Sequence, residues 1–114
     1  MLNIKDKGLV MYVIDHCNRI IDTIEGLDKQ EFLNSRDVQD IVCFNLLQIG
    51  ELAKSFSKSF LEEYPLVPWP QIKGLRDRIV HGYGDIKMER IWKTAVEDIK
   101  PLRNYCESIL EENA

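Results

Sequence analysis

The sequence lacks the long apolar runs that would point to a membrane protein. Its longest apolar run, over residues 8–14, is about seven residues long, whereas a membrane-spanning helix needs roughly 18 or more. The first residues show no basic region followed by an apolar stretch and a small-residue cleavage site, so no signal peptide is expected. We therefore expect no membrane association and a cytoplasmic location.

Closely spaced cysteines are missing as well. The three cysteines, Cys17, Cys43 and Cys106, are far apart and form no CxxC pair. An odd set at such spacing argues against both a disulfide framework and a zinc site. Each lies within an amphipathic helical pattern, so we expect all three to be small core residues in a reducing compartment.

Convincing strand alternation is also absent, and helical periodicity dominates instead. The chain of 114 residues is long enough for one domain with a core, spanning residues 1–114, and too short for two. Apolar residues three and four apart predict a first helix over about residues 6–25, and Gly26 is a plausible end. Asp28 and Glu31 fit a capping box for a short turn.

A second long helix follows, capped by Asn34 or Ser35. Its apolar stripe repeats in heptad-like steps that suit packing in a near-antiparallel bundle. The members of this stripe are Val38, Ile41, Val42, Asn45, Ile49, Leu52, Ala53 and Phe56.

Prolines separate the second helix from the rest. Three prolines within residues 65–70 cannot continue a helix, and Pro70 is well placed to begin the next one. This third helix covers roughly residues 70–81 and ends at Gly82. A fourth begins near Lys87, and Pro101 should kink it or split it near Lys100. The elements together predict an all-α fold, a four- to five-helix up-and-down bundle.

The charge is unevenly distributed. The whole chain carries a net charge of −4, but residues 71–93 contain six basic residues against three acidic ones. The remainder has nine basic against 16 acidic residues, a charge of −7. A basic segment on an acidic body can meet a phosphate backbone locally, and a solvated helix face is the alternative. Within this segment Lys73, Arg78 and Arg90 are candidate RNA-binding residues.

Only two histidines are present. His16, in the first helix, has no second histidine or ExxH pattern nearby, so we interpret it as a residue at the core boundary. The sequence predicts no metal site. His81 stands near the end of the short third helix, five residues after Arg76.

Arg76 and His81 have the chemistry needed to cleave RNA without a metal. Arginine presents a planar fork of donors to a phosphate, and histidine exchanges protons near neutral pH. The ribose 2′-OH would attack the adjacent phosphorus while arginine stabilises the charge and histidine moves protons. Asp77, four residues before His81, could orient the imidazole. The alternative is an exposed arginine and a helix-terminal histidine favoured by the helix dipole.

The helical spacing creates a difficulty, because five residues of ideal helix rotate about 140°. Arg76 and His81 then do not share a face, and one histidine must serve two proton transfers. A two-fold homodimer that pairs the third helices would bring two copies of each residue into one cleft. We therefore predict a composite site in a homodimer.

Over nearly its whole length the chain resembles the DUF86 branch of the HEPN superfamily, the HepT-like proteins. The resemblance rests on IGELA at residues 49–53, YPxxPW at 64–69, GLRDxxVHxY at 74–83, and Trp92. It implies an α-helical homodimer that acts as a metal-independent endoribonuclease, the toxin of a type II toxin–antitoxin module. It places Arg76 at the phosphate and His81 at the proton-transfer position, and the polar Asp77 fits the family pattern. No cofactor is implied.

HepT-like toxins are typically encoded beside a minimal nucleotidyltransferase antitoxin that can transfer AMP to the motif tyrosine, here Tyr83. A phosphodiester at Tyr83 would add negative charge and bulk two residues from His81 and repel an RNA phosphate. The flanking Gly82 and Gly84 should leave Tyr83 accessible. Without the resemblance, a packing tyrosine at a helix end is an equal interpretation.

Several other residues have open roles. Gly50, inside a helix, indicates close helix–helix approach. Glu51 either orients a basic group near the site or faces solvent. Asn45 is either a satisfied core or interface residue or a supporting residue of the site. Trp69 and Trp92 are expected to pack the bundle rather than stack on bases.

Two other functions compete with the ribonuclease. The first is a non-catalytic HEPN subunit that binds a minimal nucleotidyltransferase or a nucleotide. The second is a histidine phosphotransfer bundle with His81 as phosphoacceptor. Such domains place the histidine in mid-helix before a lysine-glycine signature, and Gly82-Tyr83-Gly84 does not resemble it.

Overall fold

The computed structural model describes residues 2–114, and within that range every regular element is a helix. The all-α prediction is therefore confirmed. The elements are α1 (Ile4–Ile24), α2 (Lys29–Leu33), α3 (Arg36–Ala53), α4 (Lys58–Glu63), α5 (Trp69–Gly82), the 3-10 turn η1 (Tyr83–Asp85), α6 (Met88–Glu97) and α7 (Ile99–Glu112).

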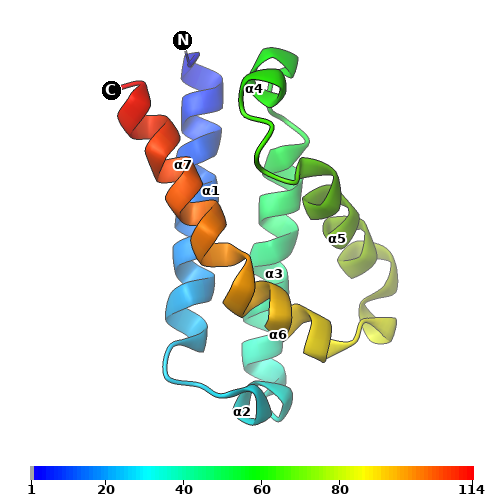
Figure 1. The fold of residues 1–114 in the computed structure, drawn as a ribbon. Helices are drawn as coiled ribbons and strands as arrows, with labels where there is room; N and C mark the ends of the chain where they lie inside the picture. Colours follow the sequence, from blue (N-terminus) through cyan, green and yellow to red (C-terminus); the bar gives the residue numbers. More distant parts are fainter. Residues whose placement is uncertain (1) are drawn as a thin grey trace.

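The helix α3 is the centre of the bundle. It packs against α1 and against α5, while α7 packs along α1 (Figure 1). In Figure 1, α6 crosses α3 on its way from η1 to α7, and the two ends of the chain lie at the same end of the molecule. The Leu2 backbone N–H donates to Asn113 Oδ1 at 3.2 Å and joins those ends. None of the helices described is long and apolar enough to cross a membrane.

Helix boundaries follow the local signals of the sequence. After α1, Gly26 has a φ of 79°, a left-handed conformation that glycine adopts readily. The predicted capping box of α2 is present: the Glu31 N–H donates to Asp28 Oδ1 at 2.8 Å, and the Asp28 N–H donates to Glu31 Oε1 at 2.9 Å. Ser35 caps α3 through its hydroxyl oxygen. The predicted split of the last helix occurs at Asp98, between α6 and α7.

Two details of α3 differ from the prediction. The helix ends at Ala53, so Phe56 is buried outside it, and Ile41 is 46% exposed rather than part of the core. The short α4 was not predicted. Its N-cap is Ser57, whose backbone N–H and hydroxyl donate to the two carboxylate oxygens of Asp6 at 3.0 and 2.5 Å. Asp6 lies 51 residues earlier and is only 2% exposed, a tertiary contact that no local pattern signals.

The cysteines are core residues, as predicted. All three are free and buried. Burial raises the pKa of the Cys43 thiol to about 11 and that of Cys106 to about 12. They therefore remain protonated at neutral pH and act as small apolar side chains.

The two tryptophans also pack the bundle, as predicted. The buried Trp69 ring lies 5.0 Å from that of Phe56, and its indole N–H donates to the Tyr64 carbonyl at 3.3 Å. This cluster fixes the start of α5. The Trp92 ring lies 5.2 Å from that of Phe32 and joins α6 to α2.

Candidate active site

The motif helix α5 lies close to α3 at Gly50, whose lack of a side chain makes this approach possible. A Cβ atom on Gly50 would lie 2.9 Å from Arg76 Cγ, nearer still to Arg76 Cβ, and 3.2 Å from the Ile72 carbonyl oxygen. No side chain at position 50 fits without moving α5. The predicted close helix–helix approach is confirmed, and it occurs at the arginine of the motif.

Two carboxylates hold the Arg76 side chain. Its Nε donates to Glu51 Oε1 across the α3–α5 interface, and its Nη1 donates to Asp77 Oδ1 at 2.9 Å. The side chain is 19% exposed. Hydrogen bonding to Asp77, followed by the contact with Glu51, raises the pKa of Arg76, so the guanidinium is charged. Of the two roles left open for Glu51, the structure shows it orienting a basic group.

His81 lies at a groove between α5 and α6 with a volume of about 590 Å³. Three cations, Arg78, Lys87 and Arg90, line this groove with His81, and they outnumber its two carboxylates, Asp77 and Asp85. None of the three cations forms an ion pair within residues 2–114. Of the predicted RNA-binding residues, Arg78 and Arg90 therefore lie together, whereas Lys73 is not among the residues described along this groove.

Arg76 and His81 of one chain do not meet. The helix α5 continues without interruption from Trp69 to Gly82, so the two side chains keep the rotation of about 140° expected for their spacing. Arg76 contacts Glu51 of α3, whereas His81 is exposed at the groove beside α6.

Asp77 contacts the arginine of the motif rather than its histidine. Among the described residues no hydrogen bond joins Asp77 to His81, although both line the groove. The Asp77 carboxylate is instead turned toward the guanidinium of the preceding residue. A charged donor one residue away is the stronger partner for a carboxylate.

Tyr83 lies against α3, in a shallow pocket with Asp40, Cys43, Phe44 and Ile79. Its hydroxyl donates to Asp40 Oδ1. Burial and, after it, the hydrogen bond to Asp40 raise the pKa of Tyr83 above its usual value. The hydroxyl is therefore neutral and oriented, and the side chain is half-buried rather than freely accessible.

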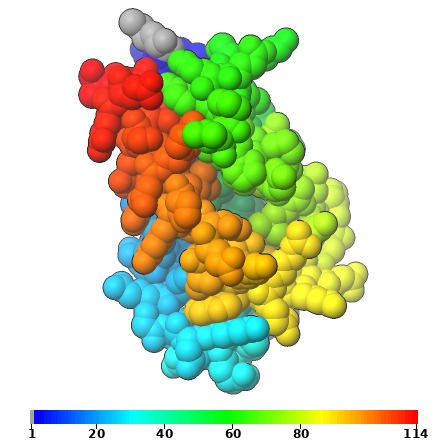
Figure 2. Space-filling model, viewed as in Figure 1, coloured from blue at the N-terminus to red at the C-terminus, as the bar shows by residue number. Residues whose placement is uncertain are grey.

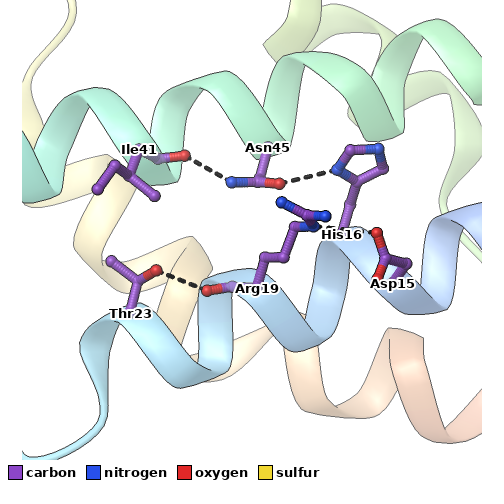
Figure 3. Close-up of polar contacts among 6 residues, drawn as sticks. All are labelled: Asp15, His16, Arg19, Thr23, Ile41 and Asn45. Atoms are coloured by element: carbon purple, nitrogen blue, oxygen red, sulfur yellow. Dashed lines mark hydrogen bonds and ion pairs between the residues drawn. The ribbon is translucent and has the colours of Figure 1, made fainter.

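Asn45 is buried between α1 and α3, as Figure 3 shows. Its Nδ2 donates to the Ile41 carbonyl at 2.8 Å, and its Oδ1 lies 2.8 Å from His16 Nδ1. Because the amide nitrogen faces a carbonyl, the oxygen faces the imidazole, and His16 Nδ1 must carry the proton. Asn45 is thus a satisfied core residue, and His16 a boundary residue. Within residues 2–114, neither side chain is hydrogen-bonded to a motif residue of α5.

Sequence reasoning did not identify Asp40 and Lys87 as site residues. Lys87 was counted in the basic segment, but only the fold brings it into the groove with His81. Asp40 lies 43 residues before Tyr83 and on another helix. Its position one turn before Phe44 on α3 gives no local signal of the contact.

Known proteins similar to this chain carry ribonuclease names. A protein of Methanocaldococcus jannaschii named "Putative RNase MJ0127" is 32% identical over 114 residues, covering 96% of this chain and 94% of the relative. "Putative RNase TTE0752" of Caldanaerobacter subterraneus is 28% identical, covering 89% and 90%. "Probable ribonuclease HepT" of Thermococcus cleftensis is 28% identical, covering 83% and 93%. No solved structure matches the chain.

The family comparison covers most of the fold. The sequence model described as "Ribonuclease HepT-like" matches residues 13–109, from α1 to α7. The matched part contains the α3–α5 contact, the basic groove and the tyrosine pocket. The chain belongs to the HepT-like ribonuclease family.

Proposed function

We propose that the protein is a metal-independent endoribonuclease in which Arg76 binds the scissile phosphate and His81 transfers protons. The observation that carries the proposal is the arrangement of α5. One helix presents an arginine held in place by Glu51 and, toward another side, an exposed histidine in a groove lined by three unpaired cations. Cleavage of an RNA strand needs both a donor that binds the phosphate and a group that carries protons.

The reaction balances without an added reactant. The ribose 2′ oxygen forms a bond to phosphorus and gives up its proton, while the bond from phosphorus to the 5′ oxygen breaks. The leaving oxygen takes a proton, and the products end in a 2′,3′-cyclic phosphate and a 5′-hydroxyl. Arg76 offsets the charge that builds on the phosphoryl oxygens, and imidazole groups accept and return the protons.

The active form is a homodimer with a composite site. Arg76 and His81 of one chain point in different directions, and each chain supplies one candidate proton carrier. The α3–α5 surface beside Tyr83 exposes apolar side chains: Phe44 is 57% exposed, and Ile41 and Val80 are also exposed. An exposed apolar surface next to the motif helix suits pairing with a second copy across a two-fold axis.

A minimal nucleotidyltransferase acts as the antitoxin by transferring AMP to Tyr83. The Tyr83 oxygen forms a bond to the α-phosphorus of ATP as pyrophosphate leaves, and the hydroxyl proton passes to Asp40, which already accepts that hydrogen bond. The adduct would lie beside Phe44, over the surface proposed to pair, so it blocks assembly of the composite site as well as repelling RNA.

A test of the ribonuclease uses labelled single-stranded RNA in EDTA with the parent protein, Arg76→Ala and His81→Ala. Arg19→Ala is the matched control, because Arg19 is an exposed α1 residue whose side chain, within residues 2–114, pairs only with Asp15. We expect the parent and the control to cleave, leaving 2′,3′-cyclic phosphate ends, and the two motif variants to be inactive.

Absence of cleavage by a folded, unmodified dimer on varied RNAs would contradict the proposal. It would favour the competing function, a non-catalytic subunit that binds a nucleotidyltransferase or a nucleotide. The observation that favours this non-catalytic function is the pairing of Arg76 with two carboxylates, because a phosphate must compete with them for the guanidinium.

A further inference from the structure

A second cavity adjoins the groove and has a different character. It has a volume of about 530 Å³, within the range of roughly 300–1,000 Å³ that small-molecule sites occupy. Its inner wall is formed by buried apolar residues of α3 and α7, including Ile49 and Leu102. Its polar side chains come from α5, α6, the α6–α7 junction and α7, and they are Gln71, Arg90, Thr94, Asp98 and Tyr105. Figure 2 faces the side of the molecule where these elements meet.

The cavity and the groove share two lining residues. Leu75 and Arg90 line both. A strand whose phosphates lie along the cations of the groove therefore passes the mouth of the cavity at Arg90. Arg90 forms no ion pair in the part of the chain that the structure describes, so its charge is free to meet a phosphate at that point.

We infer that this cavity binds one unstacked nucleobase of the RNA substrate and gives the enzyme its base preference. The inference rests on the proposed ribonuclease function. Apolar walls suit the two faces of a base, and the polar side chains can meet its Watson–Crick edge, as in single-stranded RNA recognition generally.

Asp98 decides which base fits. Its carboxylate is exposed at the edge of the cavity and only accepts hydrogen bonds. Among residues 2–114 it forms no ion pair and no capping hydrogen bond to α7. Guanine offers two adjacent donors, the ring N1–H and the 2-amino group, that a carboxylate can accept together. Adenine and cytosine offer one amino group each, whereas uracil places carbonyl oxygens on both sides of its single N–H. Guanine should bind best and uracil worst.

Other occupants suit the cavity less well. A fatty acid or another anionic apolar ligand would pair its carboxylate with Arg90 at the mouth, and its apolar chain would leave Asp98 without a donor. A neutral apolar ligand would leave Asp98, Gln71 and Thr94 without partners, which is costly once they are covered. A base attached to a phosphate chain satisfies both the polar edge of the cavity and the adjoining cations.

The test measures binding apart from cleavage. Short 2′-O-methyl oligonucleotides cannot undergo 2′-OH attack, so their dissociation constants can be measured by fluorescence anisotropy, with each of the four bases at one position. We expect guanine to bind about ten-fold more tightly than uracil, as one good base-edge contact allows. Asp98→Asn should remove this preference. Gln71→Leu should weaken binding whichever of the four bases stands at that position.

Glu97→Gln is the matched control. Glu97 is exposed, precedes Asp98 in the chain and lines neither cavity, so the variant loses the same charge and should keep the guanine preference. Equal affinity for all four bases, or a preference that survives Asp98→Asn, would overturn the inference. Free GMP binding as tightly as the oligonucleotide would also overturn it, in favour of a mononucleotide site.

Two outcomes distinguish the base pocket from the ribonuclease activity. Guanine-selective binding without cleavage of the matching unmodified RNA would support the base pocket and contradict the ribonuclease activity. Cleavage at every base without selective binding would support the ribonuclease activity and contradict the base pocket.

Discussion

Replacing Gly50 by alanine gives the sharpest test of the α3–α5 contact. In an exposed helix interior, glycine to alanine stabilises by about 1 kcal/mol. At position 50 the added Cβ would overlap the Cβ of Arg76, an atom that cannot move without the backbone of α5, and would lie 2.9 Å from Arg76 Cγ. Overpacking of this kind costs about 1–3 kcal/mol. We expect a net loss of about 1 kcal/mol in the free energy of unfolding and a melting temperature lower by about 4 °C.

The assay is urea denaturation of Gly50→Ala beside Gly8→Ala and Gly74→Ala. Gly8 and Gly74 also lie within helices, but a Cβ at either would meet nothing within 4 Å, so these variants should be as stable as the parent or more so. Because the overlap reaches Arg76 Cβ, Arg76→Ala should not restore the stability of Gly50→Ala. A Gly50→Ala protein that gains as much stability as Gly8→Ala would refute the close approach.

Three further outcomes are expected. Glu51→Gln removes a charged partner of Arg76 and should lower RNA cleavage by up to about 100-fold through misplacement of the guanidinium, with an unchanged circular dichroism spectrum; full activity would show that Glu51 does not position Arg76. On co-expression with a minimal nucleotidyltransferase, intact mass should show one AMP on the parent, less on Asp40→Asn and none on Tyr83→Phe, and an adduct that survives in Tyr83→Phe would place the modification elsewhere. Because burial raises the thiol pKa of Cys43 from 9.0 to about 11, the unfolded chain loses that proton first, so the free energy of unfolding should fall as pH rises from 9 toward 11; a flat profile in urea denaturation would contradict the burial.

The local features of the fold could be predicted because each has a signal within a few residues. The capping box at Asp28 and the break before Pro101 are examples. The start of α4 could not, because Ser57 is fixed by the carboxylate of Asp6, a partner far away in the chain. Ile41 was placed in the core because it continues the apolar stripe, and periodicity cannot tell a face covered by the same chain from one left open.

The motif residues of the candidate site could be named from the sequence, but their contacts could not. Arg76 and His81 follow from their chemistry, and Tyr83 follows from the family resemblance. The contacts of Arg76 with Glu51 and of Tyr83 with Asp40 are tertiary. Asp77 was expected at His81 and is found on Arg76, and Asp40 was not expected at all. Which carboxylate reaches which cation depends on side-chain directions that a sequence does not contain.

The unbroken helical geometry of α5 also limits how this segment of the gene can change. Each added or deleted residue turns everything after it by about 100°. A deletion between Arg76 and His81 would swing the histidine out of its groove even if every other side chain were kept. Substitutions can accumulate along α5, but its length between these two residues is fixed. The crossover at residues 64–68, which lies outside any helix, can lengthen or shorten without changing that angle.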